Sequence, residues 1–311
     1  MQRPTPVNTI RFEQCMPLLF VGIWATGFIV ARLVSPHVEP LTFLLYRFIL
    51  SAILFTTIAL YVRAPWPRGV GSWRNAIVAG VLLQAVYLGC VFWAVNHGLP
   101  AGIAALLAGL QPLLTALLAA PLLGETVGTK RWLGILLGFG GAFLVLIPQL
   151  TGTALSDAAL APLFVGLLAM LGITFGTIWQ KHTSASSDLR SNAAVQFIGA
   201  AVVMAPVALL TENGRFDMTW QAWTGLAWAV LGLSFGAISL LLIMIKRGSV
   251  ASVASLFYLV PPVVAILAYL LFDEQLSGLQ IAGMVLAALG VAIASRNPLP
   301  RTTSIAAKEP G

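Results

Sequence analysis

Long apolar runs separated by short polar gaps recur along the whole chain of 311 residues. A helix needs about 20 mostly apolar residues to cross the hydrocarbon core of a bilayer. Ten runs approach or exceed that length, and no gap between them is long enough for a soluble domain. The pattern predicts an all-α polytopic membrane protein with helices at 16–34, 40–62, 75–96, 101–123, 131–148, 159–180, 192–212, 223–246, 250–272 and 277–295.

The composition supports a lipid environment. Hydrophobic residues make up 59% of the chain and charged residues only 9%, whereas about 25% of the residues of a soluble domain are charged. A basic net charge of +7 can indicate nucleic acid, but such a partner needs basic residues gathered on one face. Here they stand singly or in pairs between the apolar runs, so we expect no nucleic-acid partner.

The distribution of Lys and Arg predicts the orientation. If the N-terminus is cytoplasmic, the inside segments hold fourteen of these residues, and the outside segments hold only Arg32 and Arg215. Cytoplasmic loops carry such an excess. We therefore expect both termini in the cytoplasm, residues 297–311 as a flexible cytoplasmic tail, and, from the compact loops, a bacterial inner membrane.

The chain resembles itself after a shift of 149 residues. Gly27 then meets Gly176, Arg32 meets Lys181, and Pro112 meets Pro261; Glu125 meets Glu274, and Gly134 and Gly141 meet Gly283 and Gly290. Helices three and eight fit a shift of 150 slightly better. Five helices per repeat is an odd number, so the second repeat must enter the membrane from the opposite side. We expect inverted repeats at 16–148 and 159–296; the alternative is chance similarity among Leu-, Ala- and Gly-rich helices.

At the level of motifs, the sequence resembles the drug/metabolite transporter superfamily, in particular its ten-helix EamA-type exporters. The marks are Tyr46-Arg47-Phe48, Pro112, Leu123-Gly124-Glu125, Gly134 and Gly141. The second half repeats them as Pro261, Glu274, Gly283 and Gly290, with Asp273 in place of the usual glycine and Gln196 opposite Arg47. Within the family the chain is most similar to bacterial exporters of aromatic and other neutral amino acids. The resemblance implies a secondary transporter that exports such amino acids and similar small metabolites.

Prolines interrupt two predicted helices at matching positions, with Pro112 in helix four and Pro261 and Pro262 in helix nine. Proline removes a backbone donor and frees the carbonyl four residues earlier, which in a membrane must face protein or a wet cavity. Interrupted helices in corresponding places of two halves indicate the binding site of a transporter. These prolines are therefore candidate hinges beside the site, and the alternative is a simple structural kink.

Polar and aromatic residues near the middle of the spans are candidate substrate-binding residues, because polar groups in hydrocarbon seek partners or water and aromatic rings stack on one another. Against this, a membrane Ser or Thr commonly bonds its own helix, and a Trp near a span end belongs to the interfacial belt. The candidates are Trp24, Gln84, Tyr87, Gln111, Thr174, Trp179 and Tyr258.

Arg47 is the clearest charge inside a predicted span. Such a charge is a functional hypothesis by default, and Arg47 could attract a substrate carboxylate. The competing interpretation, which the family-wide occurrence of this residue favours, is a structural role in helix packing. No Asp or Glu lies near the middle of a span, so proton coupling through a buried carboxylate is disfavoured and facilitated passage is the simpler hypothesis.

Several functions are disfavoured by missing motifs. The chain has no GxxxxGK[ST] phosphate loop, no Cys/His cluster at metal-ligand spacing and no set of catalytic groups at one depth. We expect no enzyme activity, no metal and no cofactor. A phosphorylated-metabolite or nucleotide-sugar exchanger of the same superfamily stays as an alternative, as do a channel and an intramembrane enzyme. The glycine patterns favour packing within one chain, and so a monomer over a dimer.

Overall fold

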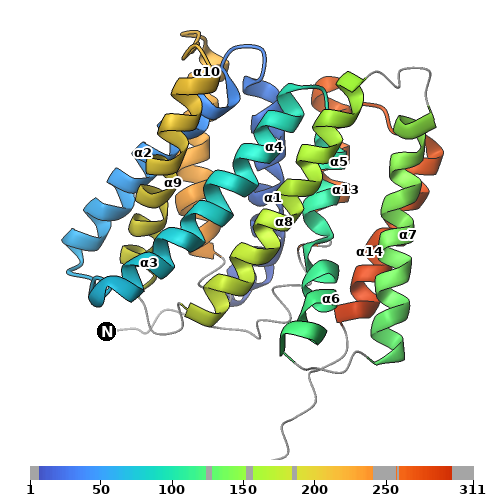
Figure 1. Cartoon of the computed structure of the whole chain (residues 1–311), viewed down its shortest axis with the longest axis horizontal. Helices are drawn as coiled ribbons and strands as arrows, with labels where there is room; N and C mark the ends of the chain where they lie inside the picture. The colour runs from blue at the N-terminus through green and yellow to red at the C-terminus, as the bar shows by residue number, and fades with distance from the viewer. Residues whose placement is uncertain are drawn as a thin grey trace, which may run out of the picture.

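The computed structural model describes residues 7–123, 128–151, 157–183, 188–240, 257 and 259–295. Within these ranges six helices are long and apolar enough to cross a membrane, and four shorter apolar helices accompany them. Together they confirm the predicted ten-helix, all-α membrane fold (Figure 1). The elements are α1 (Val7–Val34), α2 (Pro40–Tyr61), α3 (Gly69–Gly80), η1 (Val81–Val86), α4 (Tyr87–Asn96), α5 (Ala101–Gly109), α6 (Gln111–Leu123), α7 (Thr129–Thr151), α8 (Asp157–Thr183), α9 (Leu189–Thr211), α10 (Trp220–Trp228), η2 (Ala229–Ala237), α13 (Val260–Phe272) and α14 (Gly278–Ser295).

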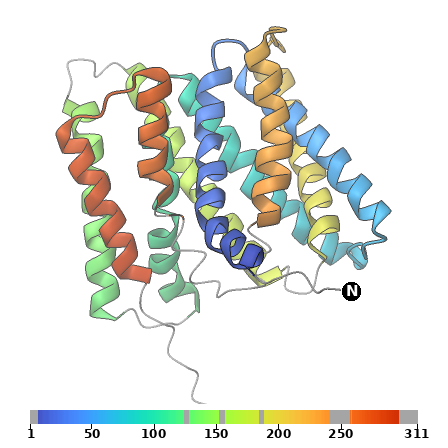
Figure 2. The same ribbon diagram turned by 180° about the vertical axis from the view of Figure 1, so that it is seen from behind.

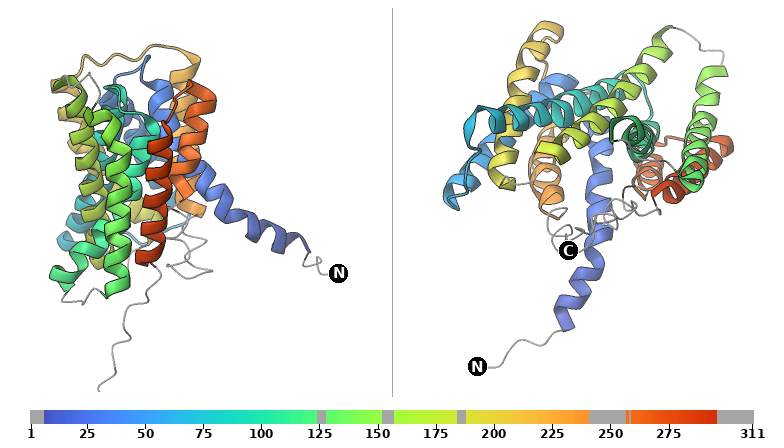
Figure 3. Two further views of the ribbon diagram at one scale, coloured as in Figure 1. Left: turned by 90° about the vertical axis from the view of Figure 1, so that its right-hand side faces the viewer. Right: turned by 60° about the horizontal axis from the view of Figure 1, so that its bottom comes forward.

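The first helix is longer than predicted. It begins at Val7 rather than at residue 16 and contains Pro17. Figure 3 shows its N-terminal part leaving the bundle. The apolar run marks the part of a helix that meets lipid or protein, whereas the helix itself continues into polar residues as long as its backbone bonds are made.

Within the described residues, three of the predicted spans are not continuous α-helices. Helix three consists of α3, the π-helical segment η1 and α4, and helix eight passes from α10 into the π-helical segment η2. Helix four is divided at Leu110 into α5 and α6. Such wide or broken turns are uncommon in helices and are frequent at functional sites. They lie at corresponding places of the two repeats, since η1 corresponds to η2 under the 150-residue shift.

The packing follows the two-fold relation of the inverted repeats. Two elements pack against their own counterpart, namely α2 against α9 and α7 against α14. The contacts between the repeats also correspond, because α1 packs against η2 and α13 while its counterpart α8 packs against η1 and α6. Figures 1 and 2 show the α7–α14 pair at one edge of the bundle and α2 with α9 toward the other. The remaining helices therefore enclose the middle, where the two repeats meet.

Glycines bring α7 and α14 into backbone contact. A Cβ added at Gly134 would stand 2.5 Å from the backbone nitrogen of Ala294, and one added at Gly283 would stand 2.6 Å from the carbonyl oxygen of Gly141. Any side chain larger than hydrogen would force the helices apart. The repeated glycines thus serve packing inside one chain, as their pattern predicted.

Candidate transport site

An aromatic cluster joins the two repeats near α1. The half-buried Trp24 of α1 lies 5.4 Å from the ring of Phe20 and 5.2 Å, edge to face, from the ring of Phe257. Phe20 itself meets Phe257 edge to face at 5.4 Å. These separations are those of favourable aromatic pairs. The cluster presents aromatic surface where the first repeat touches the second, and sequence reasoning included Trp24 but missed both phenylalanines.

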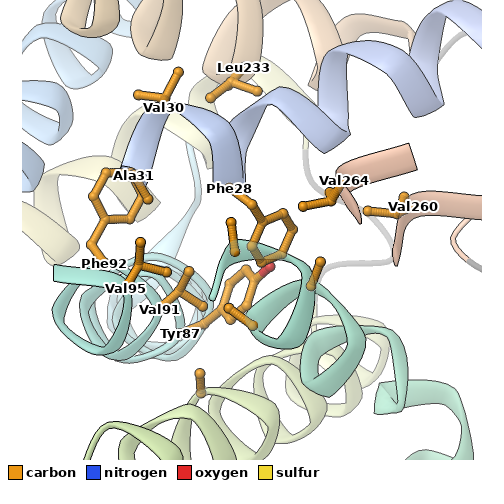
Figure 4. Packing of buried hydrophobic residues seen from close by; sticks show 14 of the residues in the cluster. Phe28, Val30, Ala31, Tyr87, Val91, Phe92, Val95, Leu233, Val260 and Val264 are labelled. Atoms are coloured by element: carbon orange, nitrogen blue, oxygen red, sulfur yellow. The ribbon is translucent and has the colours of Figure 1, made fainter. Parts of the chain in front are cut away.

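Arg47 lies in the interior and not at the lipid face. Only 6% of its surface is exposed, and its Nε donates to Ser234 Oγ of η2 at 3.3 Å. The phenol of Tyr87 on α4, which is 5% exposed, lies within electrostatic range of the guanidinium. In Figure 4 Tyr87 reaches from α4 toward Phe28 of α1. One charge, one hydroxyl and one phenol from three different helices therefore converge beside α1.

Gln84 is the polar residue of the π-helical segment η1, and it is half-buried. The 150-residue shift places it opposite Ser234 of η2. Ser234 Oγ donates to the carbonyl of Ala229 five residues earlier at 3.0 Å, a bond that the wide turn of a π-helix allows. Equivalent polar groups of the two repeats thus occupy equivalent wide turns.

Three other predicted site residues have hydrogen-bond partners away from Arg47. Thr174 is fully buried and bonds the carbonyl of Met170 in its own helix. Gln111 donates to Thr115 Oγ1 at 3.2 Å, one turn along α6. Trp179 donates from Nε1 to the carbonyl of Asn75, which links α8 to α3. None of these bonds joins the group around Arg47, and Tyr258 lies outside the described residues.

The candidate hinge prolines stand at helix starts. Pro112 is the second residue of α6, and Pro261 is the second residue of α13, where a missing backbone donor costs little. The two places are neighbours in space, since a Cβ added to Gly109 at the end of α5 would lie 3.0 Å from Pro261 Cγ. A small apolar crevice opens between them and α14; its lining includes Leu110, Pro261, Pro262, Met284 and Val291.

Glu274 ties three elements together at one end of the bundle. Its Oε1 lies 3.2 Å from Arg32 Nε at the end of α1, and its Oε2 accepts from the backbone N–H of Ala101 at the start of α5 at 3.1 Å. A carboxylate is favourable at a helix N-terminus. Since the predicted orientation places this end outside, the contacts hold α1, α5 and α13 together at the predicted outer side. The repeat partner Glu125 lies outside the described residues.

A family model for EamA-like transporters matches residues 12–147 and 160–296, one match for each repeat. The chain belongs to the EamA-like transporter family. It is therefore a transporter of the drug/metabolite superfamily, and its family members are named as transporters or efflux pumps and not as enzymes.

Relatives of this EamA-like transporter extend over most of its length. It is 27% identical to a probable amino-acid metabolite efflux pump of Escherichia coli K12 over 91% of this chain and 94% of that protein. It is 24% identical to a chloroplastic WAT1-related protein of Arabidopsis thaliana, over 84% of this chain but only 64% of the length of the plant protein. A protein of known crystal structure shares the fold, with a TM-score of 0.64 and 20% identity over 90% of this chain and 95% of that protein.

Sequence reasoning about this EamA-like transporter missed two features of the site. The pairing of Glu274 with Arg32 was not foreseen, although both residues have charged counterparts in the other repeat, Glu125 and Lys181. The π-helical segments left no sequence signal, because Val81–Val86 and Ala229–Ala237 read as ordinary apolar helix.

Proposed function

We propose that this transporter exports amino acids, aromatic and neutral ones in particular, together with similar small metabolites. Nearly full-length similarity to a protein named as a probable amino-acid metabolite efflux pump supports this substrate class. The membrane we propose is a bacterial inner membrane, with both termini in the cytoplasm.

The observation that carries the proposal is the chemistry of the groups that lie at the boundary between the two repeats. Aromatic rings of α1 face Phe257 of the second repeat, and Arg47 of the first repeat bonds Ser234 of the second. Transporters with inverted repeats bind substrate near the midplane between the repeats. An aromatic surface and a cation at this boundary suit the ring and the carboxylate of an aromatic amino acid.

The proposed mechanism is alternating access, in which one repeat rocks against the other. Its support is that Glu274 joins α1, α5 and α13 at one end of the bundle, so that this end can open only when these contacts break. Pro112 and Pro261, each the second residue of its helix, give each half a place to bend. Breaking the Glu274 contacts would free α1 and open the predicted outer side.

We propose that transport is facilitative. All ten acidic residues fall in predicted loops or at helix ends, whereas proton-coupled transporters commonly carry a buried acid or histidine within a span. The monomer is the proposed active form, since the glycines of α7 and α14 are already used against each other.

An exchanger of phosphorylated metabolites is the second transport candidate, and the described part of the chain gives it less support. A phosphate group calls for several cationic partners, but only Arg47 is a buried cation among the described residues.

The direct test is uptake of labelled phenylalanine, tryptophan, threonine and methionine into liposomes that contain the purified protein, with and without a pH gradient. Saturable uptake with counterflow, independent of the gradient, is the expected result. Dependence on the gradient would keep the substrate class and reject the uncoupled mechanism. Folded protein that takes up none of the four would reject amino acids as substrates, and transport without saturation would point to a channel.

A further inference from the structure

The charge of Arg47 has no counter-charge among the described residues. The one ion pair in the described part of the chain joins Arg32 to Glu274, and the hydrogen-bond partner of Arg47 is a neutral hydroxyl. A cation within a membrane span is costly and is normally paired. The sequence offers no carboxylate at this depth, so a partner for the guanidinium must come from outside the chain.

The groups around Arg47 are hydrogen-bond donors. Ser51 follows one turn later on α2, and its Oγ is the only fully enclosed side-chain polar atom without a hydrogen-bond partner in the described residues. Ser51 lies between Arg47 and Phe55 on one helix stripe, and this stripe faces η2, because Arg47 bonds Ser234 and Phe55 stands 6.2 Å from the ring of Phe235.

The terminal nitrogens of the guanidinium remain available. Only Nε of Arg47 makes a hydrogen bond in the described structure. The two terminal nitrogens therefore have no hydrogen-bond acceptor among the described residues. Planar guanidinium groups bind carboxylates through two parallel hydrogen bonds.

The opposite repeat shows that this place in the fold does not require a cation. Gln196 of α9 occupies the position that corresponds to Arg47, and both residues are 6% exposed. The partner positions also correspond, since Gln84 stands where Ser234 stands in the other half. A neutral amide thus satisfies the same helix environment, which argues against a purely structural role for the charge and identifies Gln as a substitution that the fold should accept.

We propose that Arg47 is the specificity-determining residue of the transporter and binds the carboxylate of the substrate, with Ser51 as a further donor and with Ser234 and Tyr87 positioning the guanidinium. The substrate supplies the missing negative charge when it enters the site. This inference rests on the proposed function for the identity of the cargo, and it restricts that cargo to carboxylates.

The experiment compares ligands that differ only at the carboxylate. Phenylalanine, 3-phenylpropionate, phenylalaninamide and phenethylamine are tested as competitors of labelled phenylalanine uptake into liposomes, for the wild type and for Arg47→Gln, Arg47→Lys and Gln196→Ala. For the wild type, phenylalanine and 3-phenylpropionate should compete and the two compounds without a carboxylate should not. Arg47→Gln should raise KM for phenylalanine about 10- to 100-fold, the range expected for loss of a charge-assisted bidentate contact.

The variants separate charge from packing. Arg47→Lys keeps the charge and should recover part of the affinity, whereas Gln196→Ala, at the corresponding neutral position, should leave the carboxylate preference unchanged. If phenylalaninamide competes as well as phenylalanine in the wild type, or if folded Arg47→Gln keeps the wild-type KM and selectivity, the proposed site is rejected.

Ligand-induced stabilisation keeps the two proposals apart. If the wild type takes up no amino acid, the proposed function fails, but 3-phenylpropionate should still raise the melting temperature of the wild type and not that of Arg47→Gln. Equal or absent stabilisation in both would reject the carboxylate site as well. If Arg47→Gln does not fold, the competitor series on the wild type and on Arg47→Lys decides the question.

Discussion

Replacing Gly141 by alanine tests the idea that backbone contact between α7 and α14 holds the two repeats together. The added methyl group would lie 2.5 Å from the carbonyl oxygen of Gly283 and closer still to the backbone nitrogen of Ala287, where ordinary contacts begin at 3.4 Å. Both neighbouring atoms belong to the backbone of α14 and cannot rotate away as a side chain could. The two helices must therefore move apart by about 1 Å in a closely packed interface.

The expected cost follows from this geometry. Overpacking a filled interface costs about 1–3 kcal/mol, and alanine returns up to about 1 kcal/mol through its higher helix propensity. Gly140→Ala is a matched control in the same helix, because Gly140 is exposed and a Cβ there meets nothing within 4 Å. Both substitutions carry the same change in propensity, so the difference between them isolates the steric term.

The assay is the free energy of unfolding from a denaturing-detergent titration of each purified variant. We expect Gly141→Ala to be about 1–3 kcal/mol less stable than Gly140→Ala. Gly290→Ala, whose methyl would meet the backbone of Gly138, should behave in the same way from the opposite helix. Equal stability of Gly141→Ala and Gly140→Ala would show that the helices do not touch as described.

Three further predictions concern the Arg32–Glu274 ion pair, the aromatic side chain of Trp24 and the carboxylate of Glu39. Arg32→Gln and Glu274→Gln should each favour the state opened at the end of the bundle where this ion pair lies, by about 0.2–1 kcal/mol, since the Arg32 side chain is 41% exposed. Thiol labelling of a cysteine introduced beside the pair measures this opening. The double variant should open no more than Glu274→Gln alone, and additive effects would argue against the pair. Trp24→Ala should weaken uptake of phenylalanine and tryptophan about 2- to 10-fold more than that of threonine, because only the aromatic substrates lose ring contacts; equal effects would show that Trp24 is structural. The backbone N–H of Arg215 lowers the pKa of Glu39, so the ionised carboxylate stabilises the fold above the ordinary pKa of a glutamate, and this stabilisation is lost as the pH falls through the lowered pKa. Glu39→Gln should therefore lower the melting temperature at neutral pH but not at a pH below the lowered pKa. The same difference in melting temperature at both pH values would contradict this.

The membrane-spanning helices could be predicted from the sequence because every backbone polar group in the bilayer must be hydrogen-bonded within the protein. Backbone groups in hydrocarbon have no water to bond, so each span must be helical, and its apolar length is visible directly. Duplicated motif residues, such as Pro112 with Pro261, likewise predicted the inverted repeat, since an odd number of five helices makes the second repeat enter the membrane from the opposite side. Even so, the apolar run hid the start of α1 at Val7, because helix formation does not stop where hydrophobicity stops.

The site depended on information that the sequence does not hold. Arg47, Tyr87 and Thr174 all stood out as polar or aromatic groups in apolar helices. In the structure Thr174 bonds its own helix, whereas Arg47 reaches Ser234 in another repeat. Periodicity fixes the face of a helix on which a residue lies, but not which helix covers that face.

The sequence by itself therefore determined the spans, the repeat and the family, because these depend on local hydrophobicity and on motif order. Only the tertiary structure decided that Glu274 joins Arg32 and Ala101 and that Arg47 bonds Ser234 and meets no counter-charge among the described residues. Those facts depend on side chains far apart in the chain, and they are set by which helices pack against one another.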